Sequence, residues 1–302
     1  MWSGLSVGKF GDGRRPHQVA GLSRVARRMD ASPGVHQRAQ GALRLSFKRR
    51  GDATVLDGLR QEGCLKARFP RTEHGAWAGA VTLNSSGGVA GGDALDISVS
   101  AGSGTRATVA SQAAERFYRA LPGTVPARVS TALRMAPGAA LEWLPQESIL
   151  FDRCAVRRRL TVDLAGDAWF LGVEQIMFGR TAMGEAVRDA GFRDVIELRR
   201  DGRLLLHDAI RLDGPVQAVL DRRAAGGGAR AVATLVHAAP DAEDKLDALR
   251  DALTGQDAGA SAWDGLLVAR IVAADGARLR AAVVAGLAAL RAGRPLPRVW
   301  FC

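Results

Sequence analysis

Cysteine and histidine, the side chains that most often hold transition metals tightly, are scarce in this chain. Among 302 residues only Cys64, Cys154 and Cys302 are cysteines. Three scattered cysteines support neither a disulfide framework nor a four-ligand zinc site, so we expect free thiols in a reducing compartment. No His-x-His or HExxH pair occurs, and the five histidines are dispersed as His17, His36, His74, His207 and His237. We therefore expect no tightly bound cofactor metal.

Long apolar runs are also missing. The longest, such as residues 281–290, are well short of the roughly 20 residues that a membrane span needs. Residues 1–26 contain no continuous apolar core, because Gly, Arg and Lys interrupt them, so they do not match a secretory signal. We expect a cytoplasmic protein with no membrane partner.

The positive charge is unevenly distributed. Residues 1–50 hold 11 Lys and Arg against Asp12 and Asp30, which accounts for +9 of the total net charge of +11. The other 252 residues are nearly neutral, unlike the folded surface of a nucleic-acid-binding domain. We expect residues 1–39 to be a basic, disordered extension. An alternative is that translation starts at Met29.

Alternation of apolar and polar residues predicts many strands, and helical spacing is found only late in the chain. Helices are predicted near residues 241–253 and 277–291. Strands followed by helices argue against an alternating βαβ fold. We predict a mainly β protein, antiparallel or a coiled, helix-like array of many strands, with a small C-terminal helical part in a single domain of residues 40–302. The predicted strands are 43–47, 64–69, 78–83, 94–100, 105–111, 128–135, 140–144, 155–164, 168–177, 195–200, 204–212, 231–237 and 266–274.

A glycine-dense turn precedes the strand at 94–100. Gly87, Gly88, Gly91 and Gly92 give its backbone access to positive φ and to close approach. The spacing from Gly87 to Gly92 fits a P-loop, but Asp93 stands where the phosphate-binding Lys is required. A strand also follows where a helix should begin. The pattern therefore predicts a tight structural turn that presents one carboxylate, at a subunit contact or at the mouth of a passage.

Two acidic residues occur in otherwise apolar strands. Glu174 lies within residues 168–178, and Asp208 shares the apolar stripe of residues 204–212. A buried carboxylate is costly unless it is paired or solvated, and Arg180 is a ready partner for Glu174. One interpretation is a structural ion pair. The other is an internal polar path for a hard or borderline cation. Glu142, Glu147 and Asp152 either line this path or are exposed loop acids.

Several segments together resemble one known family. They are LNSSGG with GGD in residues 83–93, residues 108–118, LEWLPQE with ILF in 141–151, FGR with GE in 178–185, and LPRVW in 296–300. In this order and spacing they resemble the urease accessory protein D family, called H in some bacteria. Glu115-Arg116 stands where many members have a lysine before the aromatic pair, and the basic extension is not typical of the family.

This resemblance implies a non-enzymatic maturation factor. It implies a protein that binds apo-urease and recruits an F-type accessory protein, which docks a G-type GTPase during nickel insertion. A dimeric arrangement within that complex is one option. Nickel would pass transiently, through an internal passage that carboxylates suit because they hold Ni²⁺ weakly. The matching positions are Asp93, Glu142, Glu174 and Glu185, with Arg180 as the counter-charge. Asp208 joins these passage candidates because of its place in the apolar stripe.

Two other hypotheses remain open from the sequence. A carboxylate-dependent hydrolase on a coiled β fold would place two carboxyl groups about 5–10 Å apart across an open cleft. A scaffold would instead enclose them in a narrow tunnel. A nucleic-acid binder acting through residues 1–39 would lose its function when these residues are deleted.

Overall fold

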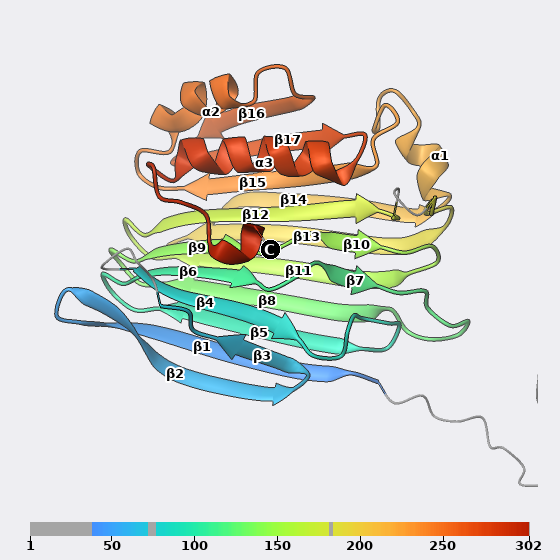
Figure 1. Ribbon diagram of the computed structural model, residues 1–302. Helices are drawn as coiled ribbons and strands as arrows, with labels where there is room; N and C mark the ends of the chain where they lie inside the picture. The colour runs from blue at the N-terminus through green and yellow to red at the C-terminus, as the bar shows by residue number, and fades with distance from the viewer. Residues whose placement is uncertain (1–37, 72–76, 181–183, 302) are drawn as a thin grey trace, which may run out of the picture. The chain divides into compact units, whose positions relative to one another are not determined.

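Two β-sheets make up most of the structure (Figure 1). The computed structural model describes residues 38–71, 77–180 and 184–301, which belong to one compact unit, and the predicted extension falls almost wholly outside these residues. In spatial order, the seven-stranded sheet consists of β14 (Arg203–Gly214), β13 (Ala190–Arg200), β11 (Ala155–Leu164), β8 (Ala127–Met135), β5 (Ala94–Ala101), β1 (Gln40–Arg50) and β2 (Ala53–Gly63).

The ten-stranded sheet carries two short strands beside its main path. Its strands are β16 (Ala258–Trp263), β17 (Leu266–Ala273), β15 (Ala231–Ala238), β12 (Trp169–Phe178), β9 (Ala140–Leu144), β6 (Arg106–Ser111), β4 (Trp77–Asn84) and β3 (Leu65–Arg68). β10 (Ser148–Leu150) pairs with β12, and β7 (Glu115–Phe117) pairs with β10.

The chain coils between the two sheets. From β4 to β13 the longer strands alternate between the ten-stranded and the seven-stranded sheet. Each strand therefore pairs in parallel with the next strand of its own sheet, as β5 with β8 and β6 with β9. Parallel neighbours need a crossover, and here the strand of the opposite sheet supplies it. The predicted coiled array is confirmed, while antiparallel pairs are confined to the sheet ends.

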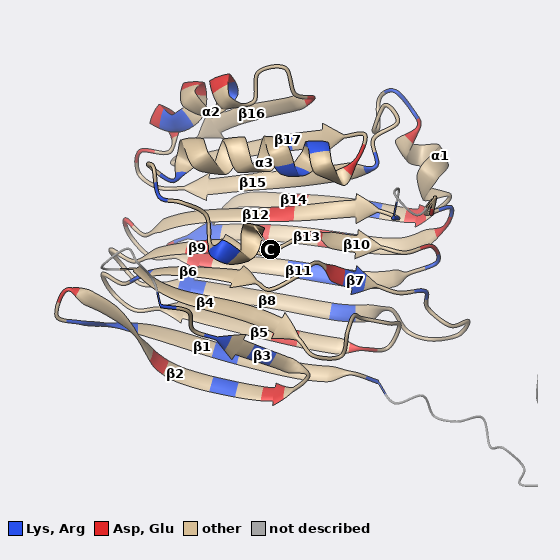
Figure 2. Ribbon diagram, viewed as in Figure 1, with Lys and Arg blue, Asp and Glu red and all other residues tan. Residues whose placement is uncertain are grey.

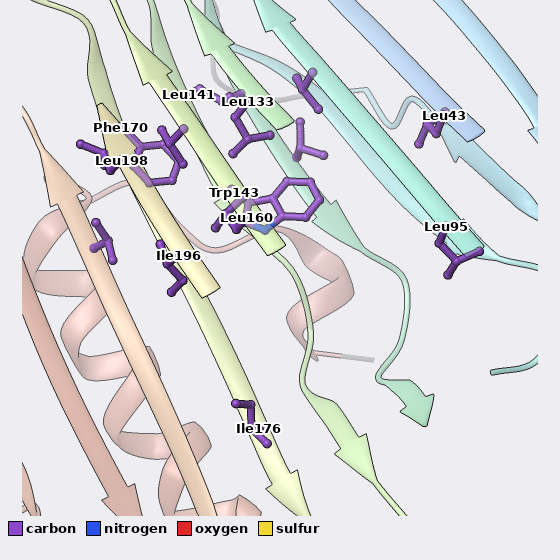
Figure 3. Packing of buried hydrophobic residues seen from close by; sticks show 14 of the residues in the cluster. Leu43, Leu95, Leu133, Leu141, Trp143, Leu160, Phe170, Ile176, Ile196 and Leu198 are labelled. Carbon is purple, nitrogen blue, oxygen red and sulfur yellow. The ribbon is translucent and has the colours of Figure 1, made fainter. Parts of the chain in front are cut away.

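The main hydrophobic core fills the space between the sheets (Figure 3). Side chains alternate across each strand, so on β9 Leu141 and Trp143 point into this core, whereas Glu142 and Leu144 face the outer side of the sheet. Burying one such apolar side chain contributes about 1.5–3 kcal/mol. Acidic and basic residues are interspersed along the strands of both sheets (Figure 2).

A second core lies between the ten-stranded sheet and the helices α2 (Leu246–Ala252) and α3 (Gly276–Leu290). Leu279, Val283, Leu287 and Leu290 form the buried stripe of α3, and Asp275 caps its first turn. The helix predicted at 277–291 is thus confirmed. The one predicted at 241–253 consists of a 3₁₀ turn η2 (Glu243–Lys245) followed by α2. Among the described residues, no helix is long and apolar enough to cross a membrane.

Five strands and α-helices of the described residues escaped prediction, as did the short 3₁₀ helix η3 (Arg298–Phe301). β2 is an edge strand with little burial, and a bulge between Ser46 and Phe47 disrupts its register with β1, so its apolar residues do not alternate. β7 and β10 are too short to show a period. The remaining two are β16, whose small residues carry little pattern, and the five-residue helix α1 (Val216–Leu220).

Candidate functional site

A cavity of about 350 Å³ lies between the two sheets. It reaches the surface beside the glycine turn, where the exposed residues Gly87 and Gln112 line it. Its inner part is lined by Arg158, Glu174 and Asp194, which come from three different strands. The coil thus places these polar side chains between the two sheets, in a region that is otherwise filled by the main hydrophobic core.

One guanidinium joins two carboxylates at the inner end of this cavity. Arg158 lies on the same face of β11 as Val156 and Leu160, so it points inward. Its Nη2 lies 3.0 Å from Glu174 Oε2 and 2.5 Å from Asp194 Oδ2, and its Nε donates to Asp194 Oδ1 at 3.2 Å. The side chains of Arg158, Glu174 and Asp194 are only 9%, 13% and 7% exposed, so this is a buried ion cluster.

The cluster holds two carboxyl groups and one guanidinium, so ionisation of both carboxyls leaves one uncompensated negative charge. Burial raises the pKa of the Glu174 carboxyl, Arg158 opposes this, and the charge of Asp194 adds to it, so that the pKa lies above its ordinary value. Burial lowers the pKa of Arg158, but Asp194 and Glu174 raise it more, which keeps the guanidinium charged. Trp143 Nε1 donates to Glu174 Oε1 at 2.9 Å and orients that carboxylate.

A third carboxylate, Glu115, lines the cavity between the cluster and the glycine turn. Asn84 Nδ2 donates to its Oε2 at 3.2 Å. Burial raises the pKa of Glu115, and the hydrogen bond from Asn84 opposes that shift. The sequence analysis missed Glu115, Arg158 and Asp194 as site residues.

Glu142 does not line the cavity, because it faces the outer side of β9. Its fully buried carboxylate accepts hydrogen bonds from Arg291 at 2.8 and 2.9 Å, from Arg294 at 2.7 Å and from Thr108 at 2.6 Å. Burial alone would raise the pKa of Glu142, but Arg291, Thr108 and Arg294 together lower it. Glu142 therefore anchors the end of α3 and the residues that follow it.

The prediction that Arg180 pairs with Glu174 was wrong. Arg180 lies beyond the end of β12 and pairs with Glu185 at 2.7 Å, while its guanidinium lies 4.5 Å from the ring centre of Phe151. Since Glu174 points inward from the middle of β12, Arg180 is not its ion-pair partner, and Arg158 is.

Asp208 faces inward from β14 as its apolar neighbours suggested, but it pairs with Arg270 of β17 at 2.7 Å. It thereby joins the two sheets away from the residues that line the cavity. Of the two interpretations given above, this geometry fits the structural ion pair.

For two further acids, Glu147 and Asp152, the sequence allowed either a place on the polar path or a position in an exposed loop. Asp152 accepts hydrogen bonds from the backbone N–H groups of Arg188 and Asp189, and Glu147 lies 3.6 Å from Arg280. Neither acid lines the cavity. Both acids therefore stabilise the loops in which they lie: Asp152 binds the backbone of residues 188–189, and Glu147 pairs with Arg280.

The glycine turn does not present the carboxylate of Asp93, and that prediction was wrong. Asp93 is buried, with Oδ1 accepting from Ala39 N and Oδ2 from Ala90 N, both at 2.8 Å. The unsatisfied backbone donors of a tight turn recruit the carboxylate inward. The glycines have the expected structural role: Gly88 has φ +144°, and a Cβ there would lie 2.3 Å from the ring of Tyr118.

Of the five carboxylates predicted to line a passage, the structure places Glu174 on the cavity. The turn glycines Gly87 and Gly88 also line it. Within the described residues, no group of three or more His, Cys, Asp and Glu side chains is arranged to hold a metal ion. Carboxylates beside a solvent-sized space suit brief cation contacts better than permanent coordination. Nickel passage stays a prediction.

These features define a coiled β protein with a cavity inside its core and a buried ion cluster at the inner end of that cavity. The family model for UreD urease accessory protein matches residues 39–301. A urease accessory protein UreD from Rhizobium leguminosarum bv. trifolii is 48% identical over 273 residues, which cover 90% of this chain and 99% of that protein. The UreD protein of Methylobacterium sp. strain 4-46 is 47% identical, with 87% and 95% covered. The chain belongs to the UreD family of urease accessory proteins.

Proposed function

We propose that this protein is a non-catalytic scaffold of urease maturation in the cytoplasm, and that its cavity offers a route for nickel. Membership of the urease accessory family supports the maturation role. The observation that carries the nickel route is the cavity itself, which Glu115, Glu174 and Asp194 line and in which Glu174 and Asp194 contact the buried guanidinium of Arg158. Carboxylates in a poorly solvated space attract cations.

In this proposal the protein binds apo-urease and an F-type accessory protein, which brings the G-type GTPase. GTP hydrolysis and metal insertion belong to those partners. The chain supplies surfaces and a passage, as a monomer or a dimer within the complex. Nickel is cargo here, so the absence of a three-ligand cluster in the described residues is compatible with the role.

The test of the scaffold is a urease operon expressed with and without this gene. Urease made without the protein is expected to contain little nickel and to be inactive, and expression of the full chain is expected to restore both. Fully active, nickel-loaded urease in its absence would refute the proposal. Deleting residues 1–39 is expected to change little, and a complete loss would favour the nucleic-acid hypothesis.

The route is tested by Glu174→Gln, which keeps the shape of the side chain. We expect intact complexes with reduced nickel in urease. The matched control is Asp208→Asn, because Asp208 is also a partly buried, Arg-paired carboxylate but does not line the cavity. Equal nickel content for Glu174→Gln and wild type would remove the route while leaving the scaffold role intact.

The cluster geometry argues against a hydrolase. Glu174 and Asp194 both contact Nη2 of Arg158, so a cation fills the space where a substrate bond and a water molecule would have to lie.

A further inference from the structure

The position of Arg158 suggests more than a structural ion pair. Its Nη2 contacts Glu174 of one sheet and Asp194 of the other, so the guanidinium spans the inner end of the cavity. We propose that Arg158 is a gating residue: a tethered cation that closes the cavity at Glu174 and Asp194 and moves toward Glu115 when a divalent cation takes its place. This inference rests on the proposed cation route.

The charge balance provides the driving force. When both carboxyl groups are ionised, one guanidinium leaves one negative charge of the buried cluster uncompensated, whereas a divalent cation between Glu174 and Asp194 compensates both. Electrostatic interactions are strong in such poorly solvated surroundings. A displaced Arg158 then needs a new partner, because an unpaired buried charge costs several kcal/mol.

Strand register provides that partner. Ser148 of β10 already accepts a hydrogen bond from Nη1 of Arg158. Ser148 pairs directly with Glu115 of β7, and paired residues of adjacent strands present their side chains on the same face, about 4.8 Å apart. On its other side Ser148 pairs with Ile176, two residues from Glu174. Glu174, Ser148 and Glu115 thus form a row along which the guanidinium can move.

Glu115 has the properties of an alternative partner. It lines the same cavity, and its side chain accepts hydrogen bonds from neutral Asn84 and from the backbone N–H of Arg116. Among the described residues this half-buried carboxylate forms no salt bridge, and the arrival of Arg158 would supply one. The observed structure is the closed state in this scheme.

The experiment measures Ni²⁺ affinity of the purified full-length chain by calorimetry, with circular dichroism to confirm folding. Arg158→Gln removes the competing cation and is expected to raise affinity at least tenfold. Glu115→Gln removes the second position of Arg158 and is expected to weaken affinity about tenfold. In the Arg158→Gln background, Glu115→Gln is expected to have no effect, whereas Glu174→Gln is expected to abolish the gain.

A matched control is Arg157→Gln, since Arg157 precedes Arg158 on β11 but lies on its exposed face and does not line the cavity. It is expected to leave the affinity unchanged. Unchanged or absent Ni²⁺ binding in folded Arg158→Gln, or equal effects of Glu115→Gln in both backgrounds, would overturn the gate. If Arg158→Gln does not fold, the isosteric Glu115→Gln variant is the remaining test. A Ni²⁺ affinity of Glu115→Gln equal to that of the wild type then refutes the proposal. These results are independent of whether urease needs the protein.

Discussion

The buried cluster around Glu142 allows a sharp prediction about stability. Its carboxylate is fully buried and receives hydrogen bonds from Arg291, Arg294 and Thr108. Glu142→Gln keeps the side-chain shape but removes the charge, which leaves Arg291 buried without a counter-ion. Breaking a buried ion pair from one side costs about 3–5 kcal/mol. A domain is stable by about 5–15 kcal/mol, so the variant should lose a large share of its stability.

The assay is chemical denaturation of the full-length chain at pH 7, followed by far-ultraviolet circular dichroism. The control is Asp264→Asn, which breaks an exposed ion pair with Arg203 and should change the free energy of unfolding by less than about 1 kcal/mol. If Glu142→Gln is no more destabilised than this control, the anchoring role assigned to Glu142 is incorrect.

The same variant makes a pH prediction. The pKa of Glu142 is lower in the folded state than its ordinary value of 4.5, so its ionisation stabilises the fold above that pH. This contribution is lost as the pH falls through the folded-state pKa. The stability difference between wild type and Glu142→Gln should therefore be constant near neutrality and shrink below pH 4.5. A difference that grows on acidification would contradict the assignment.

Three further predictions concern other parts of the fold. Gly88→Ala should cost about 2 kcal/mol or more, from positive φ and a clash with Tyr118, whereas Gly87→Ala, which meets no atom within 4 Å, should cost about 1–2 kcal/mol by urea denaturation. Burial lowers the pKa of His237, so stability should decline as the pH falls below 6.5, and His237→Phe should reduce that decline. Trp300→Ala empties a fully buried site and should lower the unfolding free energy by about 3–5 kcal/mol; a loss under 1 kcal/mol would contradict its packing role.

Period-two alternation was a dependable guide to the coil because each long strand buries one face in the inter-sheet core. The edge strand β2 lacks that constraint, and neither β7 nor β10 is long enough to display it. The parallel pairing could not be read from local pattern, because alternation says which face is buried and nothing about which strand lies alongside.

The site residues also differ in whether the local sequence pattern reveals them or only the arrangement of the strands does. Glu174 was found because a charge inside an apolar run is conspicuous. Arg158 was missed within three consecutive arginines, of which only one lies on the buried face with Val156 and Leu160. Counting by twos from those residues would have identified it. Its partner Asp194 becomes recognisable only when β11 and β13 are known to be neighbours.

The residues after α3 have a consequence for synthesis of the protein. Arg291 and Arg294 neutralise Glu142, and the short helical turn η3 (Arg298–Phe301) places Trp300 in the second core. These residues leave the ribosome after nearly every strand has been made. Until they emerge, the nascent chain holds an uncompensated carboxylate on an apolar sheet face. A ribosome that stops at residue 290 should therefore release a chain that chaperones and proteases treat as unfinished.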